Sequence, residues 1–162
     1  MNIKIPTAIS LREIEILNKL SLNKNVLEIG SLLGYSTINI ARHAHKVTSI
    51  DPHEGYPYEG ADSTLGKFIS NLNYYNIRNV KVFKDRFQNI AKQDYDFAFI
   101  DLDGQYQTTM EVLEYTKHIP VIAIHDFDRP RCSGVAHAVK DAGANIVQVI
   151  DTCAIIENIY KT

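Results

Sequence analysis

The chain has 162 residues, a formal net charge of −2 and 45% hydrophobic residues, which is typical of a single soluble globular domain. No run of residues approaches the apolar length of a membrane span, and the slightly acidic balance supplies no basic surface for nucleic acid. The two separated cysteines and an N-terminus without the apolar core of a signal peptide predict a cytoplasmic protein with reduced thiols.

Predicted helices and strands alternate in the first half of the chain. Ser10 and Glu13 have the spacing of a capping box, which predicts a helix that ends near Leu20. The next expected elements are a buried strand over 26–29, a helix over 36–44, a strand over 46–50, a loop over 53–60, a helix capped by Asp62 with Leu65, Phe68, Ile69 and Leu72 on one face, and a strand over 79–83. This alternation favours parallel strands joined by helices.

The second half of the chain continues this alternation but ends differently. The expected elements are a short helix over 86–91, a strand over 95–100, a helix over 107–117 with Tyr106, Met110 and Leu113 inward, a strand over 120–124, and a helix from Ser133 to Gly143 with Val135, Ala138, Val139 and Ala142 inward. Two strands, 145–150 and 153–160, then follow without a helix between them, which predicts an antiparallel edge. The predicted fold class is α/β, a doubly wound, Rossmann-like, mostly parallel sheet in one domain over 1–162, with 1–22 as a helical extension.

The stretch 25–37 carries the main functional signal, because an apolar strand ends at Gly30 and a helix begins soon after Gly34. Such a strand–loop–helix turn presents backbone N–H groups and a helix N-terminus to a ligand. A dinucleotide fingerprint would need glycines where this chain has Leu32 and Tyr35. The loop therefore favours a ligand that has an adenosine but no pyrophosphate.

Asp51 ends the next strand, in a position where a carboxylate can accept both hydroxyls of a ribose. The distance from the glycine loop suits NAD equally well, so only the missing glycine distinguishes the two cofactors. The alternative role for Asp51 is to cap a loop.

Three stretches of the chain resemble one enzyme family. Glu28-x-Gly30-x-x-x-Gly34-Tyr35-Ser36 resembles motif I of class I S-adenosylmethionine-dependent methyltransferases, and its ending is similar to small-molecule O-methyltransferases of the catechol and caffeoyl-CoA types. Residues 99–106 resemble the F-I-D-G-D-H-S-Y run of the bacterial relatives that modify sugars and macrolides. Residues 121–128, followed by 132–135, resemble the H-D-Y and P-G-V runs of the same group. One departure is that Gly104 stands where the resemblance leads us to expect a histidine.

This resemblance implies a seven-stranded sheet with the order 3-2-1-4-5-7-6 and O-methylation of a small-molecule hydroxyl with S-adenosylmethionine. It also implies that Glu28 supports the loop and the methionine amino group, that Ser36 holds the methionine carboxylate, and that Asp85 and Arg86 lie near the adenine. The expected cofactor-binding residues are Glu28, Gly30, Ser31, Gly34, Tyr35, Ser36, Asp51, Asp85, Arg86 and Asp101.

Asp101 and Asp126 end two strands that should be neighbours, about 4.8 Å apart, so their carboxylates can converge. Two carboxylates with open water positions suit Mg²⁺, and Asp103 or Asp128 could add a ligand. In catechol-type enzymes, carboxylates at these strand ends hold such a metal, although the amide that follows there is Phe127 here. The alternative is that Asp101 contacts the cofactor, Asp126 caps a loop and no metal binds.

The predicted catalytic residues are His125, Asp126 and Asp101. If no metal binds, His125 is the expected general base; if a metal binds, it is an orienting or proton-accepting neighbour, and a purely structural role is the alternative. A neutral imidazole titrates near pH 6.5 and can take a hydroxyl proton. Adjacent residues of an extended chain point to opposite sides, so His125 and Asp126 are not expected to face one atom. His53 is a further candidate for the pocket, whereas the remaining histidines, His43, His45, His118 and His137, are expected at the surface or in packing.

Two other functions remain as alternatives. The Gly104 departure leaves open an adenosylmethionine-binding protein without transferase activity. An NAD-dependent reductase is opposed by Leu32 and by the absence of a Tyr-x-x-x-Lys pair. The expected partner is a small-molecule acceptor rather than nucleic acid or a membrane, and a second copy of the chain is an open alternative for completing the pocket.

Overall fold

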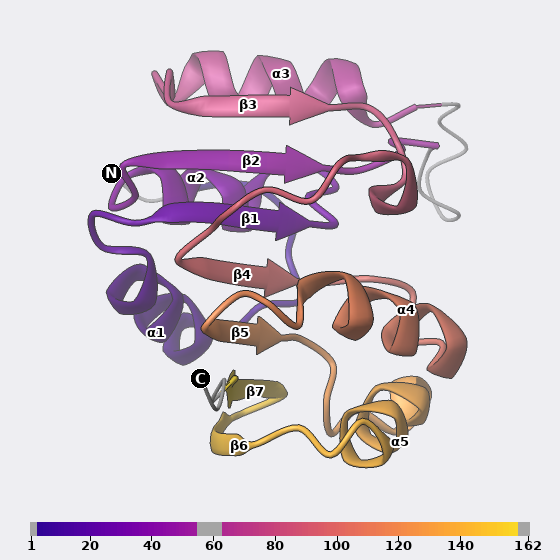
Figure 1. The fold of residues 1–162 in the computed structure, drawn as a ribbon. Coiled ribbons are helices and arrows are strands. Elements are labelled where there is room, and N and C mark those ends of the chain that lie inside the picture. The colour runs from indigo at the N-terminus through magenta and orange to yellow at the C-terminus, as the bar shows by residue number, and fades with distance from the viewer. Residues whose placement is uncertain (1–2, 55–62, 159–162) are drawn as a thin grey trace.

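The computed structural model describes residues 3–54 and 63–158, and these residues form a single mixed sheet flanked by helices (Figure 1). The strands are β1 (Asn25–Ile29), β2 (Lys46–Ile50), β3 (Val80–Phe83), β4 (Phe97–Ile100), β5 (Val121–Ile124), β6 (Ile146–Ile150) and β7 (Cys153–Glu157). Their order is β3-β2-β1-β4-β5-β7-β6, which confirms the predicted topology. Strands β1 to β5 are parallel, whereas β7 runs antiparallel to both β5 and β6.

Helices cover both faces of this sheet. They are α1 (Leu11–Ser21), α2 (Tyr35–Ala41), α3 (Leu65–Tyr74), α4 (Tyr106–Thr116) and α5 (Ser133–Asp141), with short 3-10 turns η1 (Phe87–Asn89) and η2 (Pro130–Cys132). Val112 of α4 and Val135 of α5 pack with the side chains of one face, among them Leu27. Leu17 of α1 and Ile40 of α2 pack on the opposite face, and α3 extends that layer over β3. Both faces of the central strands are thus buried, as expected for parallel strands between helices.

Some predicted side-chain positions are wrong, and all of them lie at or near helix ends or on helix flanks. Tyr106 is 41% exposed because it begins α4, and its hydroxyl donates to Asp141. Ala142 is exposed because α5 ends one residue earlier. Ile69 is 39% exposed on the flank of α3, beside the buried Phe68. The predicted cap residue, Asp62, lies outside the described residues.

The carboxyl ends of the parallel strands meet at one edge of the sheet, where open α/β sheets bind ligands. Figure 1 shows β1, β2, β4 and β5 pointing towards this edge. In the two described segments, no helix is long and apolar enough to span a membrane.

Candidate functional site

A cavity of about 950 Å³ lies at the carboxyl ends of the parallel strands. The segment 6–9 before α1 forms part of its wall. Of the residues that sequence analysis predicted for the site, the cavity is lined by Gly30, Ser31, Tyr35, Ser36, Asp51, Asp85, Arg86, Asp101, His125 and Asp126. Glu28, Gly34 and His53 are not part of this lining.

The two glycines of the loop after β1 serve different contacts. Both adopt the left-handed backbone region, with φ of 88° at Gly30 and 89° at Gly34. A Cβ added at Gly30 would lie 1.8 Å from the carbonyl oxygen of Asp101, so only glycine lets the two chain segments approach. A Cβ at Gly34 would instead lie 3.1 Å from the ring of Phe68, on the core side of the loop. A side chain at position 34 would therefore meet the core, and the cofactor contact of Gly34 stays a prediction.

Asp51 holds the glycine loop in place from the end of β2. Its Oδ2 accepts the backbone N–H groups of Ser31 and Leu32 at 2.8 and 2.9 Å, and its Oδ1 accepts that of His53 at 2.7 Å. A carboxylate offers about four acceptor positions, so these bonds leave about one for a ligand. Recognition of a ribose hydroxyl stays a prediction, while the loop-holding alternative describes what Asp51 does in this structure.

Glu28 lies beneath the loop and is 0% exposed. Its two oxygens accept the hydroxyls of Ser36 and Thr37, both at 2.6 Å, which ties β1 to the first turn of α2. Burial raises the pKa of Glu28 to about 7, although these two hydrogen bonds lower it. The part of its predicted role that supports the loop agrees with this position, and the contact with a methionine amino group stays a prediction.

Glu28→Gln is expected to raise the free energy of unfolding at pH 8.5 by up to about 3 kcal/mol and to change it little at pH 5. A carboxyl whose folded pKa is raised stabilises the fold fully below its unfolded value of 4.5, and that contribution is lost as the pH rises through about 7. The amide resembles the protonated carboxyl and does not titrate. Urea unfolding of both proteins at the two pH values measures the difference, and an equal difference at both would contradict this assignment.

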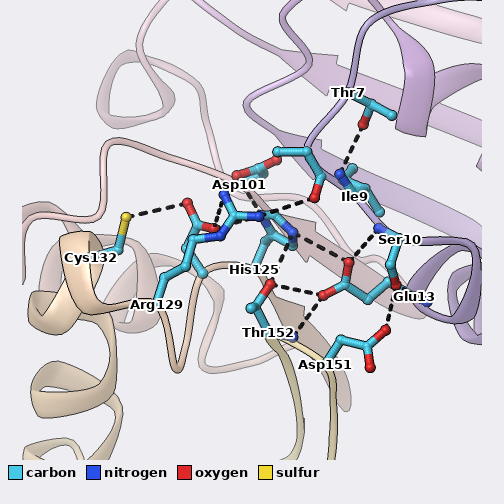
Figure 2. A network of polar contacts seen from close by, with 12 residues as sticks. Thr7, Ile9, Ser10, Glu13, Asp101, His125, Arg129, Cys132, Asp151 and Thr152 are labelled. Carbon is cyan, nitrogen blue, oxygen red and sulfur yellow. Dashed lines mark hydrogen bonds and ion pairs between the residues drawn. The ribbon is translucent and has the colours of Figure 1, made fainter.

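His125 follows β5 and forms the centre of a buried polar cluster (Figure 2). Its Nδ1 lies 3.2 Å from Asp101 Oδ1 and 3.3 Å from Asp126 Oδ1. Its Nε2 lies 3.6 Å from Glu13 Oε2 and 3.4 Å from the hydroxyl of Thr152. The imidazole is 2% exposed, so three carboxylates surround one buried ring.

The expectation that His125 and Asp126 face different directions is wrong. Strand β5 ends at Ile124, and Asp126 has a φ of 61°, which turns the chain back on itself. Side-chain alternation holds only within an extended strand. The turn brings one atom each of Asp101, His125 and Asp126 within 4.8 Å of one another.

The charges around His125 shift its pKa from the unperturbed value near 6.5. Burial lowers the pKa of His125, but hydrogen bonds and charges from Asp101, Glu13 and Asp126 together raise it to about 10. Burial raises the pKa of Glu13, but hydrogen bonds from His125, Ser10 and Thr152 lower it to about 2. These carboxylates favour the charged form of the imidazole, and the role of His125 as general base stays a prediction.

The donor atoms of this cluster fit a divalent metal ion. Asp101 and Asp126 each offer a carboxylate oxygen, and His125 offers Nδ1. Asp126 Oδ1 is buried and accepts no hydrogen bond from the described part of the chain, although Arg129 Nη1 pairs with it at 3.0 Å. Asp103 lines the cavity, but its oxygens accept from Gln105 and Thr108, and Asp128 is not part of the lining.

Sequence reasoning missed Glu13, Arg129 and Thr152. Glu13 was assigned only to the cap of α1, and that role is confirmed by its bond to the Ser10 N–H at 2.7 Å. Nothing in the spacing could show that its other oxygen accepts from Thr152, which lies 139 residues away. Arg129 Nη2 also donates to the carbonyl of Ala8 at 3.1 Å, which ties the segment before α1 to the cluster.

The packing around Gly104 explains why glycine, rather than the expected histidine, occupies this position. Its φ is 73°, and a Cβ there would lie 2.8 Å from both Cβ and Sγ of Cys132. The Cys132 thiol itself donates to Asp126 at 3.4 Å. The thiol side chain therefore occupies the space that the expected histidine would need.

The remaining predicted residues lie at the rim or inside the core. Asp85 accepts the N–H of Arg86 and the amide of Asn89, and these bonds lower its pKa. Arg86 pairs with Glu54 at 2.8 Å on the exposed rim of the cavity. His53 is 1% exposed and contacts Thr64, so it packs in the interior.

The chain is similar to known methyltransferases in sequence and in structure. The sequence model of a family described as a methyltransferase domain matches residues 27–127. No curated protein sequence gives a significant match. The structure is similar to the O-methyltransferase from Bacillus cereus in complex with SAH, with 22% identity, a TM-score of 0.69, and coverage of 92% of this chain and 82% of that one.

Two further solved structures share the fold. The O-methyltransferase TomG from Streptomyces achromogenes, in complex with SAM, is 19% identical with a TM-score of 0.69, and the match covers 93% of this chain and 81% of that one. An rRNA methylase from Streptococcus thermophilus is 18% identical with a TM-score of 0.64, and the match covers 89% of this chain and 92% of that one. At these identities the similarity establishes the fold.

Proposed function

Because the chain belongs to the methyltransferase-domain family matched over residues 27–127, we propose that it transfers a methyl group from S-adenosylmethionine to a hydroxyl of a small molecule. The observation that supports this best is the single cavity that joins the glycine loop to the cluster around His125. Its volume of about 950 Å³ lies in the range of small-molecule sites, and residues at both ends of the cavity match the resemblance seen in the sequence.

The half of the cavity beside β1 and β2 would hold the cofactor. Asp51 fixes the backbone of Ser31 and Leu32, so the loop is already shaped before a ligand arrives. Ser36 lines the cavity at the start of α2, where the helix dipole favours a carboxylate. Bound adenosylmethionine would supply a methyl group that its sulfonium charge has already activated.

The half beside β4 and β5 would hold the acceptor. Asp101, His125 and Asp126 would bind a divalent ion, which would supply Lewis acidity and lower the pKa of an acceptor hydroxyl. The residues of the chain would position that hydroxyl and exclude water, with the segment 6–9 and Arg129 as parts of the wall. A small neutral acceptor fits this acidic half, with Asp101, Asp103 and Asp126 in its lining, better than the phosphate backbone of a nucleic acid.

The protein is expected to bind adenosylhomocysteine in isothermal titration calorimetry and to show no heat with NAD. Binding of NAD instead, or of neither compound, would contradict the proposal. Labelled adenosylmethionine is then offered with catechols, with sugar hydroxyls and with RNA in separate reactions. We expect transfer to a small molecule. Transfer to RNA alone would overturn the acceptor class, and cofactor binding with no transfer would favour the binding-protein alternative.

A further inference from the structure

We propose that Glu13 is a positioning residue that holds the proton of His125 on Nε2 and so makes Nδ1 the third metal-binding atom beside Asp101 and Asp126. Glu13 lies on α1, outside the matched residues 27–127, so the family match does not assign this role. The role of Glu13 belongs to the metal-binding half of the proposed function and rests on it.

The Glu13 carboxylate is buried and fixed from two directions. Its side chain is 2% exposed. Oε2 accepts the backbone N–H of Ser10 at 2.7 Å, and Oε1 accepts both the N–H and the hydroxyl of Thr152 at 2.9 Å. A helix cap alone would leave this carboxylate in water. Here it is held between α1 and the turn before β7, facing the imidazole (Figure 2).

Among the described residues, the polar atoms near Nε2 of His125 are two oxygens that can accept a hydrogen bond. Glu13 Oε2 lies 3.6 Å away, and the Thr152 oxygen lies 3.4 Å away. Because the Thr152 hydroxyl gives its hydrogen to Glu13, its lone pairs are what remain for the imidazole. A lone pair on Nε2 would meet these oxygens unfavourably. A metal ion bound by Asp101 and Asp126 would displace the proton from Nδ1, so in the metal-bound state the remaining proton lies on Nε2.

With the proton on Nε2, a neutral imidazole presents a lone pair on Nδ1. That lone pair points at Asp101 Oδ1 and Asp126 Oδ1, at 3.2 and 3.3 Å. Ligand atoms on adjacent positions of an octahedral ion with bonds of about 2.1 Å lie about 3 Å apart. The arrangement therefore matches the carboxylate–histidine–metal pattern, in which an outer carboxylate orients the ligating ring.

The imidazole of His125 influences the relative affinity of this cluster for different divalent ions. Mg²⁺ takes oxygen ligands and keeps waters, whereas imidazole suits first-row transition ions. Two carboxylates and one imidazole therefore favour Mn²⁺, Co²⁺ or Zn²⁺ over the Mg²⁺ that the sequence predicted. The imidazole is therefore expected to increase the preference of the cluster for Co²⁺ over Mg²⁺.

The test is a titration of the metal-free, full-length protein with CoCl₂ and with MgCl₂, followed by calorimetry and by the visible absorption of bound Co²⁺. We expect Co²⁺ to bind more tightly than Mg²⁺. Glu13→Gln should weaken Co²⁺ binding about 10- to 100-fold and alter the spectrum, as removal of an outer-shell partner does. The variant Ser10→Ala is the matched control, because it removes the hydroxyl that caps Glu13 N–H but leaves the carboxylate. It should lower stability without changing Co²⁺ affinity.

Unchanged Co²⁺ affinity in Glu13→Gln, tighter binding of Mg²⁺, or the absence of metal binding would each overturn the role of Glu13. If Glu13→Gln does not fold, NMR of the wild-type protein with ¹⁵N-labelled histidine and Zn²⁺ decides, since a proton on Nδ1 of His125 would overturn it. Adenosylhomocysteine binding is measured on the same samples. Failure of the metal results with this binding intact rejects only the present inference, whereas loss of cofactor binding rejects the proposed function.

Discussion

Gly30→Ala is expected to lower the free energy of unfolding by about 3 kcal/mol or more and to abolish cofactor binding. The new methyl carbon would lie 1.8 Å from the carbonyl oxygen of Asp101, and backbone on one side must shift. The φ of 88° adds the strain of a left-handed conformation to that clash. Because Asp101 is also a cluster residue, the shift would disturb both halves of the cavity. Urea unfolding and adenosylhomocysteine calorimetry measure the two effects.

Gly66→Ala is the control for this variant. Gly66 lies in α3, and a Cβ there would meet no atom within 4 Å. Alanine should therefore stabilise the helix by about 0.5–1 kcal/mol and leave cofactor binding unchanged. Similar behaviour of the two variants would show that the close approach of Gly30 and Asp101 is not what the loop requires.

Asp51→Ala is expected to weaken adenosylhomocysteine binding about 100-fold, or by about 2.7 kcal/mol. The substitution leaves the N–H groups of Ser31, Leu32 and His53 without their acceptor, so the loop loses its shape before any ligand contact is considered. Calorimetry measures the affinity, and circular dichroism checks the fold.

Asp51→Asn separates the two parts of this effect. An amide keeps one acceptor oxygen but has no charge, so it should retain part of the loop and give an intermediate affinity. Full affinity in both variants would remove Asp51 from the cofactor site. Full loss in Asp51→Asn would show that the charge itself, rather than the number of acceptors, governs binding.

The mostly parallel sheet and the meeting of Asp101 with Asp126 could be predicted from local patterns and parallel connections, whereas the strand order was implied by the family resemblance. Alternating helices and strands define the sheet, and parallel neighbours end at one edge. The direction of Asp126 could not be predicted, since its φ of 61° is a property of the turn after β5 and not of the strand. The role of Glu13 was hidden for another reason: its capping-box spacing already gave it a sufficient local explanation.

The pKa of His125 could not be predicted either. It depends on three carboxylates brought from α1, β4 and the turn after β5, and sequence distance says nothing of how those segments pack. Similarly, the motif around Gly34 could not show that a side chain at this position would meet the ring of Phe68. Sequence motifs therefore predict where the site lies, whereas tertiary packing determines which atoms line it.

The bond between Glu13 and Thr152 has a consequence for how the protein is made. The two residues are 139 positions apart, so during translation the first leaves the ribosome long before the second is synthesised. Strands β1 to β5 can pair in order as they emerge, but the carboxylate of α1 finds its anchor only when the turn before β7 arrives. The polar cluster around His125 is therefore completed last, and a nascent chain stalled before that turn would carry the glycine loop without the contact between Glu13 and Thr152.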